Sequence, residues 1–166
     1  EVRRQISEMF GEDTLYEGGL SVRTSLDPGT QVLARRALMN GLVKFDMQQG
    51  WRGPVEHVEI GADWGKAVAE VTPLTDVLEW KLAVVLSVSG NEVGIGLRPD
   101  REPGTSKVSD ERATGTIPAA EMSWAKGANL KVGDVVYVEK TDDGWELQQI
   151  PAISGALVSM DPNTGR

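Results

Sequence analysis

Residues 20–37 read Leu-Ser-Val-Arg-Thr-Ser-Leu-Asp-Pro-Gly-Thr-Gln-Val-Leu-Ala-Arg-Arg-Ala, and this stretch contains two different hydrophobic spacings. Over residues 20–26 apolar and polar side chains alternate, which is the spacing of a half-buried strand. Asp27 is suited to accept hydrogen bonds from a first helical turn, and Pro28 fits a position where a missing N–H costs nothing. The apolar residues that follow fall on one helical face. The sequence therefore predicts a strand over 20–26 that leads into a helix over 28–44.

The segments before and after this predicted strand and helix also contain secondary-structure signals. Residues 1–10 place apolar side chains at helical spacing and are followed by Gly11, which predicts a short helix and then a connector over 12–19. After the second helix, residues 48–54 contain two glycines and a proline, and these residues break helices. We therefore predict an interdomain linker over residues 1–50.

Beyond residue 50 the sequence favours β-structure. All five tryptophans lie there, and turn-forming stretches at 89–92 and 141–144 separate short apolar segments. Several short strands within about seventy residues are typical of a small barrel, with the OB-fold as the natural candidate. We expect a mainly β chain with some α, in which an OB-like barrel covers 51–150 beside a strand–helix linker. The predicted strands cover residues 81–88, 93–97, 113–118, 135–139 and 145–150.

Two stretches of this β-rich region are less regular. Residues 55–75 show only weak helical spacing and stay unassigned. Residues 99–112 are rich in proline, glycine, serine and charge, so we expect an exposed, mobile loop. Loops of this kind often carry contacts with partners. The candidate interaction surface consists of Arg101, Glu102, Lys107, Asp110, Glu111 and Arg112.

The last segment predicts one more strand. Residues 154–160 are largely apolar, and residues 161–165 (Asp-Pro-Asn-Thr-Gly) form a turn that normally leads into a partner strand. We expect residues 151–166 to be the first strand and turn of a further domain. Because bare strand edges template pairing, this strand and the one at 20–26 are expected to seek a partner.

Composition and charge limit the classes of function. The formal net charge is −8, from 17 Lys and Arg against 25 Asp and Glu. This charge disfavours nucleic acid, whose binding depends on cationic side chains that neutralise phosphates. The chain has no cysteine and only His57 as histidine, so neither a thiolate nor a cluster of histidines is available to hold a metal ion. We expect no cofactor and no metal site.

Two separated motifs carry a family resemblance. Residues 18–28 read Gly-Gly-Leu-Ser-Val-Arg-Thr-Ser-Leu-Asp-Pro and resemble the Gly-Gly-x-x-Val-x-Thr-Thr-Leu-Asp-Pro connecting segment of class A, bifunctional penicillin-binding proteins. Residues 147–151 (Leu-Gln-Gln-Ile-Pro), together with 155–165, are similar to the first strand and turn of their transpeptidase domain. In long, type 1a-like members an OB-like domain is inserted between these two motifs. The resemblance extends over nearly the whole chain.

The resemblance has several implications. It implies a non-catalytic regulatory or interaction region of a peptidoglycan synthase that builds the cell wall, with glycosyltransferase and DD-transpeptidase residues outside this chain. It implies a periplasmic location for a parent protein anchored in the inner membrane, with no direct membrane contact by this region. The implied partners are the adjoining transpeptidase and glycosyltransferase domains, and an envelope lipoprotein or peptidoglycan.

Three short patterns match transpeptidase motifs, but in the wrong order and context. Residues 123–126 match Ser-x-x-Lys, residues 89–91 match Ser-x-Asn, and residues 140–142 fall one residue short of Lys-Thr-Gly. The family places Ser-x-x-Lys before Ser-x-Asn, which is the reverse of the order here. Ser123 is also predicted in a short turn, where no long buried helix is available to activate Lys126. We therefore expect no catalytic residue in this chain.

An alternative function is that of an independent OB-fold module that binds single-stranded nucleic acid or an oligosaccharide. Such modules stack bases on exposed aromatic rings that lie among cationic side chains. Trp124 and Trp145 stand instead among apolar residues, with Asp142 and Asp143 close in sequence. We therefore predict that both rings pack in the core or against another domain.

Overall fold

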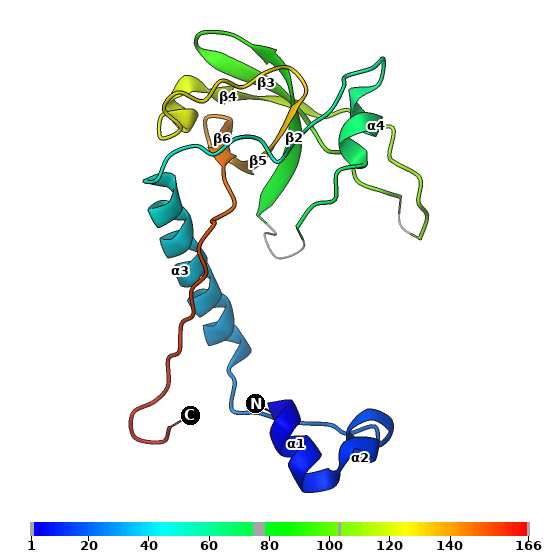
Figure 1. The fold of residues 1–166 in the computed structure, drawn as a ribbon, viewed down its shortest axis with the longest axis vertical. Helices are drawn as coiled ribbons and strands as arrows, with labels where there is room; N and C mark the ends of the chain where they lie inside the picture. The colour runs from blue at the N-terminus through cyan, green and yellow to red at the C-terminus, as the bar shows by residue number, and fades with distance from the viewer. Residues whose placement is uncertain (1, 75–78, 103, 166) are drawn as a thin grey trace. The chain divides into compact units, whose positions relative to one another are not determined.

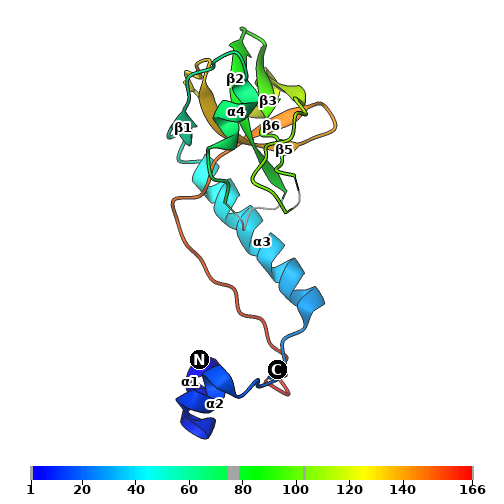
Figure 2. The ribbon, with the colours of Figure 1, turned by 90° about the vertical axis from the view of Figure 1, so that its right-hand side faces the viewer.

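A computed structural model of the chain describes residues 2–74, 79–102 and 104–165. Figures 1 and 2 show its elements from two directions. The helices are α1 (Val2–Phe10), α2 (Glu12–Glu17), α3 (Pro28–Met47), α4 (Trp64–Ala69) and the 3-10 helix η1 (Ala119–Met122). The strands are β1 (Glu56–His57), β2 (Trp80–Val88), β3 (Glu92–Leu97), β4 (Thr114–Pro118), β5 (Asp134–Lys140) and β6 (Trp145–Gln148).

The chain divides into two compact units, and each is described by itself. The smaller unit comprises Glu1–Arg36 and Leu157–Arg166. In it the short helices α1 and α2 contact each other, and the Arg3 guanidinium lies 5.7 Å from the centre of the Tyr16 ring. The larger unit comprises Ala37–Ala156 and contains strands β1 to β6.

The larger unit is built on one antiparallel sheet with the order β1-β5-β2-β3-β4, in which β6 also pairs with β5. The sheet closes because β4 and β6 approach each other without a ladder between them. At this seam a Cβ atom on Gly115 would lie 2.5 Å from Nε1 of Trp145, so only glycine fits there. Figure 1 shows β4 and β6 on the side of the barrel that also carries η1.

The alternation of side chains along the strands gives the barrel two apolar layers. In β5 the buried residues Val136 and Val138 point into the barrel, where they pack with Ile95 and Leu147. Their neighbours in sequence point outward into a second cluster, which α4 covers. Burying each such side chain contributes about 1.5–3 kcal/mol. These two layers fix the register of β5, since a slip by one residue would exchange them.

The strand predictions within the β-rich region are confirmed. The segments 81–88, 93–97, 113–118 and 135–139 correspond to β2, β3, β4 and β5, and 145–150 corresponds to β6 with a two-residue shorter end. The helices predicted over residues 1–10 and 28–44 are also present, as α1 and α3. Asp27 begins α3 as expected, because its Oδ1 accepts from the N–H of Thr30 at 2.6 Å.

Three local predictions are wrong. The predicted connector 12–19 contains α2, which starts after Gly11 (φ 82°) with Glu12 and Asp13 in its first turn. Carboxylates at that position favour a helix. Residues 20–26 and 154–160 form no strand, although both have apolar side chains at strand spacing. A strand needs a neighbour for its backbone N–H and C=O groups, and neither segment is paired in a ladder with another described residue.

Candidate interaction surface and barrel junction

The loop that carries the six candidate residues has its own hydrogen-bonded structure. Arg101 and Val108 form an isolated antiparallel bridge, and the N–H of Glu102 donates to the carbonyl of Lys107 at 2.9 Å. The ammonium of Lys107 also lies 2.8 Å from Oε1 of Glu102. These contacts fold the tip of the loop back on itself. Glu102 and Lys107, two of the candidate residues, therefore form an ion pair with each other.

Arginines fasten this loop to the end of α4. Arg98 donates to the carbonyl oxygens of Val71 at 3.0 Å and Ala69 at 2.9 Å. Arg101 donates a longer bond of 3.4 Å to the carbonyl of Ala69 and lies 3.9 Å from the Glu70 carboxylate. The last carbonyl groups of a helix lack partners within the helix. The arginines supply these donors, so the loop and α4 form one structural element.

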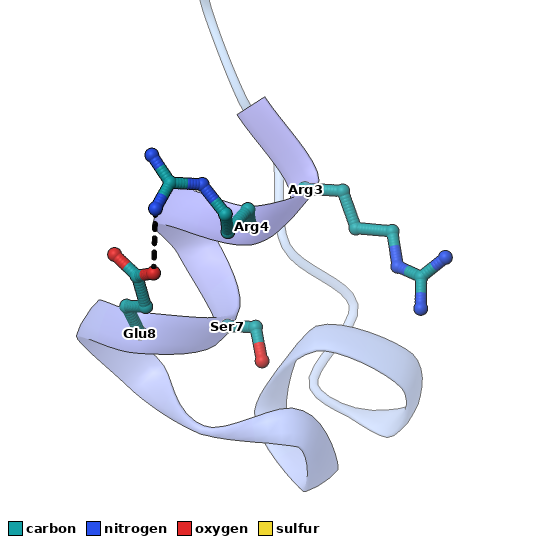
Figure 3. A pocket seen from close by; sticks show the side chains of 4 residues that line it. All are labelled: Arg3, Arg4, Ser7 and Glu8. Atoms are coloured by element: carbon teal, nitrogen blue, oxygen red, sulfur yellow. Dashed lines mark hydrogen bonds and ion pairs between the residues drawn. The ribbon is translucent and has the colours of Figure 1, made fainter. Parts of the chain in front are cut away.

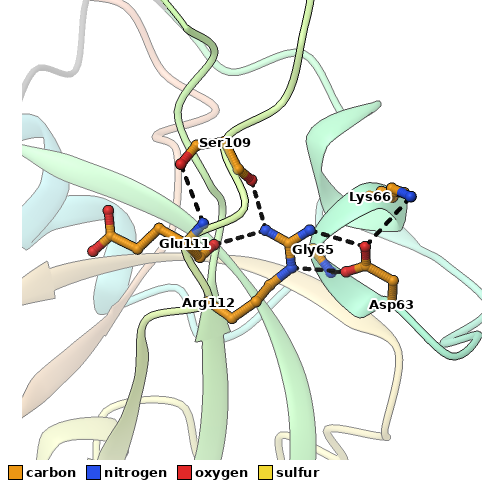
Figure 4. Close-up of polar contacts among 6 residues, drawn as sticks. All are labelled: Asp63, Gly65, Lys66, Ser109, Glu111 and Arg112. Carbon is orange, nitrogen blue, oxygen red and sulfur yellow. Dashed lines mark hydrogen bonds and ion pairs between the residues drawn. The ribbon is translucent and has the colours of Figure 1, made fainter.

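Arg112 holds the other end of the loop to the start of α4 (Figure 4). Its Nε and Nη2 atoms donate to the two carboxylate oxygens of Asp63 at 2.7 and 2.9 Å. Asp63 is the N-cap of α4 and also accepts from the N–H of Gly65 at 3.2 Å. The hydrogen bonds from Arg112 are the main reason that the pKa of Asp63 falls to about 2. The carboxylate is therefore charged at neutral pH and the pair is a full ion pair.

The packing of α4 on the barrel depends on a glycine. A Cβ atom on Gly96 in β3 would lie 2.6 Å from the ring of Trp64, the first residue of α4. The ring thus sits directly on the backbone of β3, which only glycine permits. The Arg112 guanidinium lies 6.0 Å from the centre of the same ring. Trp64 therefore fixes both the helix and the arginine that clamps the loop.

The structure brings the candidate residues to one side of α4 but gives them different roles. Arg101 and Arg112 are engaged with backbone and carboxylate partners, whereas the side chains of Asp110 and Glu111 are exposed. A shallow depression lies between α4 and the loop, with small apolar side chains among charged ones. Its lining residues are Lys66, Ala67, Glu70, Lys107, Val108 and Asp110.

Sequence reasoning missed the α4 side of this surface. Asp63, Lys66 and Glu70 lie in the segment 55–75, which stayed unassigned. Asp63 directly before a short apolar run was a usable signal, because aspartate is a preferred N-cap residue. Nothing in the sequence indicated its pairing with Arg112, which is 49 residues away.

A second polar site lies where the chain enters and leaves the barrel. The buried carboxylate of Asp46, near the end of α3, accepts from Arg52 at 2.8 Å, from Gln149 at 2.9 Å and from the N–H of Ala152 at 3.0 Å. Burial alone would raise the pKa of Asp46, but the hydrogen bonds from Ala152, Gln149 and Arg52 and the charge of Arg52 lower it below its ordinary value. The sequence analysis did not identify this network.

The patterns that resemble transpeptidase motifs lie in turns. The backbone N–H of Ser123 donates to the carbonyl of Ala120 at the end of η1. The hydroxyl of Ser89 donates to the carbonyl of Glu92 in the β2–β3 turn. Lys140 is the last residue of β5, and residues 141 and 142 begin the turn that leads to β6. Each pattern is thus part of local turn structure.

The rings of Trp124 and Trp145 pack as predicted. Trp145 is 8% exposed and belongs to the interior cluster. Trp124 packs against that cluster, its indole N–H donates to the carbonyl of Leu147 at 3.1 Å, and its ring meets Trp51 edge to face. Neither ring forms an open stacking platform.

Two further sets of polar side chains form local contacts. His57 in β1 pairs through Nδ1 with Oδ1 of Asp134 at 2.8 Å, which fastens β1 to the start of β5. Arg3, Arg4, Ser7 and Glu8 line a shallow depression on α1 (Figure 3), where Arg4 and Glu8 form an exposed ion pair. Exposed pairs of this kind contribute little stability. Within the described part of the chain, no group of three or more His, Cys, Asp or Glu side chains is placed to hold a metal ion, and no helix is long and apolar enough to cross a membrane.

Comparisons with known proteins agree with this architecture. The family model "Penicillin-binding protein OB-like domain" matches residues 51–153. Penicillin-binding protein 1A of Rickettsia typhi is 38% identical over 173 residues, which cover 100% of this chain and 20% of the relative. The corresponding protein of Haemophilus influenzae is 30% identical over 169 residues, or 99% of this chain and 18% of the relative.

A solved structure shows the same fold. The crystal structure of penicillin-binding protein 1A from Haemophilus influenzae matches with a TM-score of 0.70 and 28% identity, over 91% of this chain and 22% of that chain. This match confirms the predicted fold class of an OB-like β-barrel with some helix. The chain spans about a fifth of the length of the curated relatives that it matches. It belongs to the class A penicillin-binding protein family, is similar to the 1A type, and carries the family's OB-like domain.

Proposed function

We propose that this chain is a non-catalytic regulatory module of a bifunctional peptidoglycan synthase, and that it docks an envelope partner on the surface formed by α4 and the loop 98–112. The observation that carries the proposal is the attachment of the loop by Arg98, Arg101 and Arg112 at both ends of α4. A loop that is already held in place loses less conformational entropy when a partner binds.

The chemistry of this surface favours a protein or peptide partner. Lys66 and Lys107 lie around the depression together with Glu70 and Asp110, so both signs of charge are interspersed. A polyanion would be repelled by the carboxylates and by the net charge of −8. A protein surface with complementary charges gains specificity and association rate from such a pattern. A lipoprotein of the cell envelope is the class of partner that the family resemblance implies.

The domain organisation is part of the proposal. We assign residues 1–50 to an interdomain linker, 51–150 to the OB-like domain and 151–166 to the start of the transpeptidase domain. Large apolar side chains are exposed both on α3 and in the extended C-terminal segment. They include Val32 (59% exposed), Leu33 (66%) and Val158 (81%). Side chains of this kind are expected to be covered by the adjoining domains of the parent protein.

The proposal places catalysis outside this chain. The parent protein would be a periplasmic synthase anchored in the inner membrane, with its glycosyltransferase and DD-transpeptidase residues in the adjoining domains. Ser123 lies at the end of the four-residue helix η1. Such a short element offers no buried helix on which a lysine could activate a serine. Fluorescent penicillin is therefore expected to leave this chain unlabelled.

Site-specific photocrosslinking in the parent protein tests the docking surface. A photoreactive amino acid is placed at Asp110 on the proposed surface, and at the exposed Asn91 in the β2–β3 turn as a matched control. We expect an adduct with an envelope protein from position 110 and none from position 91. Equal adducts from both positions, or none from position 110, would contradict the proposal.

A further inference from the structure

We propose that Asp46 holds three parts of the chain together as one rigid body: the barrel, the C-terminal turns of α3 and the outgoing segment up to Ala156. We call this connection the joint. A single buried carboxylate bonds to both chain connections of the barrel. On the incoming side it accepts from Arg52 at 2.8 Å. On the outgoing side it accepts from Gln149 at 2.9 Å and from the N–H of Ala152 at 3.0 Å.

The network around this carboxylate also joins the two connections to each other. The side-chain oxygen of Gln149 accepts from the N–H of Arg52 at 2.8 Å, and its nitrogen donates to the carbonyl of Gly50 at 3.1 Å. The second arm of Arg52 donates to the carbonyl of Ile150 at 2.6 Å. The network is buried at Asp46 and Gln149 and reaches the surface at Arg52. A polar network in which each member has partners favours a single arrangement.

Without the network, the incoming connection would be flexible. Gly50 has φ 87° and Gly53 has φ 119°, and glycine populates such conformations together with many others. Hydrogen bonds to Gly50 and Arg52 on either side of Trp51 remove this freedom. The glycine-rich segment that breaks the helix is thus held by its neighbours rather than by its own sequence.

Apolar packing supports the joint on the outgoing side. A Cβ atom on Gly155 would lie 3.1 Å from a methyl group of Leu42 and 3.2 Å from one of Leu38, both on α3. Met39 of α3 and Ile150 pack against the same outer cluster of the barrel. A force that displaces the barrel is therefore passed to the last turns of α3 and to the outgoing segment together.

Distance measurements between spin labels test the joint. Because the chain has no cysteine, Lys44→Cys on α3 and Asn91→Cys at the β2–β3 turn provide two unique labels at exposed positions. With Asp46 intact we expect one narrow distance distribution. Asp46→Asn replaces an acceptor by an N–H donor that faces other donors, so we expect the narrow peak to broaden or split. Asp134→Asn, a change at another buried carboxylate, is the control.

Each outcome decides the proposal. A broader distribution in Asp46→Asn, with a narrow peak in Asp134→Asn, supports the joint. An unchanged peak in Asp46→Asn, or equal broadening in both variants, overturns it. If Asp46→Asn does not fold, Arg52→Gln is measured instead. It removes the arm that reaches Asp46, and it must broaden the peak while exchange of the backbone amides at position 52 and at Ala152 becomes about tenfold faster.

Discussion

Two arginine–aspartate ion pairs with almost equal N–O distances have different structural roles in this molecule. Arg52 lies 2.8 Å from Asp46, and Arg112 lies 2.7 Å from Asp63. The Asp46 side chain is 3% exposed, whereas that of Asp63 is 35% exposed. Asp46 also accepts from Ala152 and Gln149, which lie about 100 residues later in the sequence, where the chain leaves the barrel. Asp63 also has a further donor, the N–H of Gly65, but that donor belongs to the helix that Asp63 caps. Burial, and donors from a distant part of the chain, therefore distinguish the pair that we propose to hold the domain together from the pair that positions a loop.

The largest expected effect is that of removing the buried carboxylate. Asp46→Ala leaves the N–H of Ala152 and one of the two amide hydrogens of Gln149 without an acceptor, because both donate to that carboxylate, while the other amide hydrogen keeps the carbonyl of Gly50. Buried donors left unpaired are costly, so we expect the free energy of unfolding to fall by about 2–4 kcal/mol. Urea denaturation of the chain and of the variant measures this difference. A loss below about 1 kcal/mol would show that the network adds little stability.

The pair between Arg112 and Asp63 should affect the loop more strongly than global stability. Asp63→Ala frees Arg112 and removes the N-cap of α4. Both side chains are partly accessible to water and the cap serves one short helix, so we expect only a small fall in the free energy of unfolding, with a correspondingly smaller fall in melting temperature than in Asp46→Ala. Hydrogen exchange over residues 99–112 should become faster at the same time. A large fall in melting temperature, or an unchanged exchange rate in the loop, would remove the distinction between the two pairs.

Acid should separate the loop clamp from an ordinary surface carboxylate. The pKa of Asp63 is about 2, below its ordinary value of 3.8, chiefly because Arg112 donates to it. A group whose pKa is lowered by folding stabilises the folded state above the ordinary value and loses this contribution as pH falls towards the lowered one. The clamp should therefore weaken between about pH 4 and pH 2. A carboxyl-carbon NMR titration of Asp63 with a midpoint near 3.8 would contradict this account.

The smallest expected effect concerns Glu146, a half-buried carboxylate with other carboxylates nearby. Burial, followed by the nearby charges of Glu121 and Glu139, raises the pKa of Glu146 in β6. A raised pKa means that stability is lost as pH rises through it. Glu146→Gln should therefore slightly raise the melting temperature at pH 7 and have no effect well below the ordinary pKa of glutamate. Equal stability of the two proteins at both pH values would show that the carboxylate is adequately solvated.

The fold was largely predictable because each strand of the barrel is indicated by its own short stretch of sequence. Alternation along 81–88 and 93–97, with a turn-forming sequence between them, is enough to specify the β2–β3 hairpin. Alternation at 20–26 and the apolar content of 154–160 predicted strands that the structure does not contain, since pairing depends on a neighbour that the local sequence does not encode. Alternation therefore indicates a potential strand, and the available partner decides whether it forms.

The candidate site was predictable only in part, for a similar reason. The charged loop residues could be found from composition, and they do lie together beside α4. Their partners could not be found, because Arg112 and Asp63 are far apart in sequence and no short motif links them. Asp46 was hidden more completely, since it looks like one more polar residue at the end of an amphipathic helix. Only its burial among distant donors reveals its role.

The difference between the two pairs can be tested most directly by the photocrosslink from position 110 in the parent protein. The yield of adduct is compared in Asp63→Asn and Asp46→Asn backgrounds, at a temperature at which both variants are folded. Because the Arg112–Asp63 pair positions the docking loop and the Arg52–Asp46 pair does not, we predict that the adduct yield falls strongly in Asp63→Asn and is retained in Asp46→Asn. An adduct that persists in Asp63→Asn, or that falls equally in both backgrounds, would contradict this account.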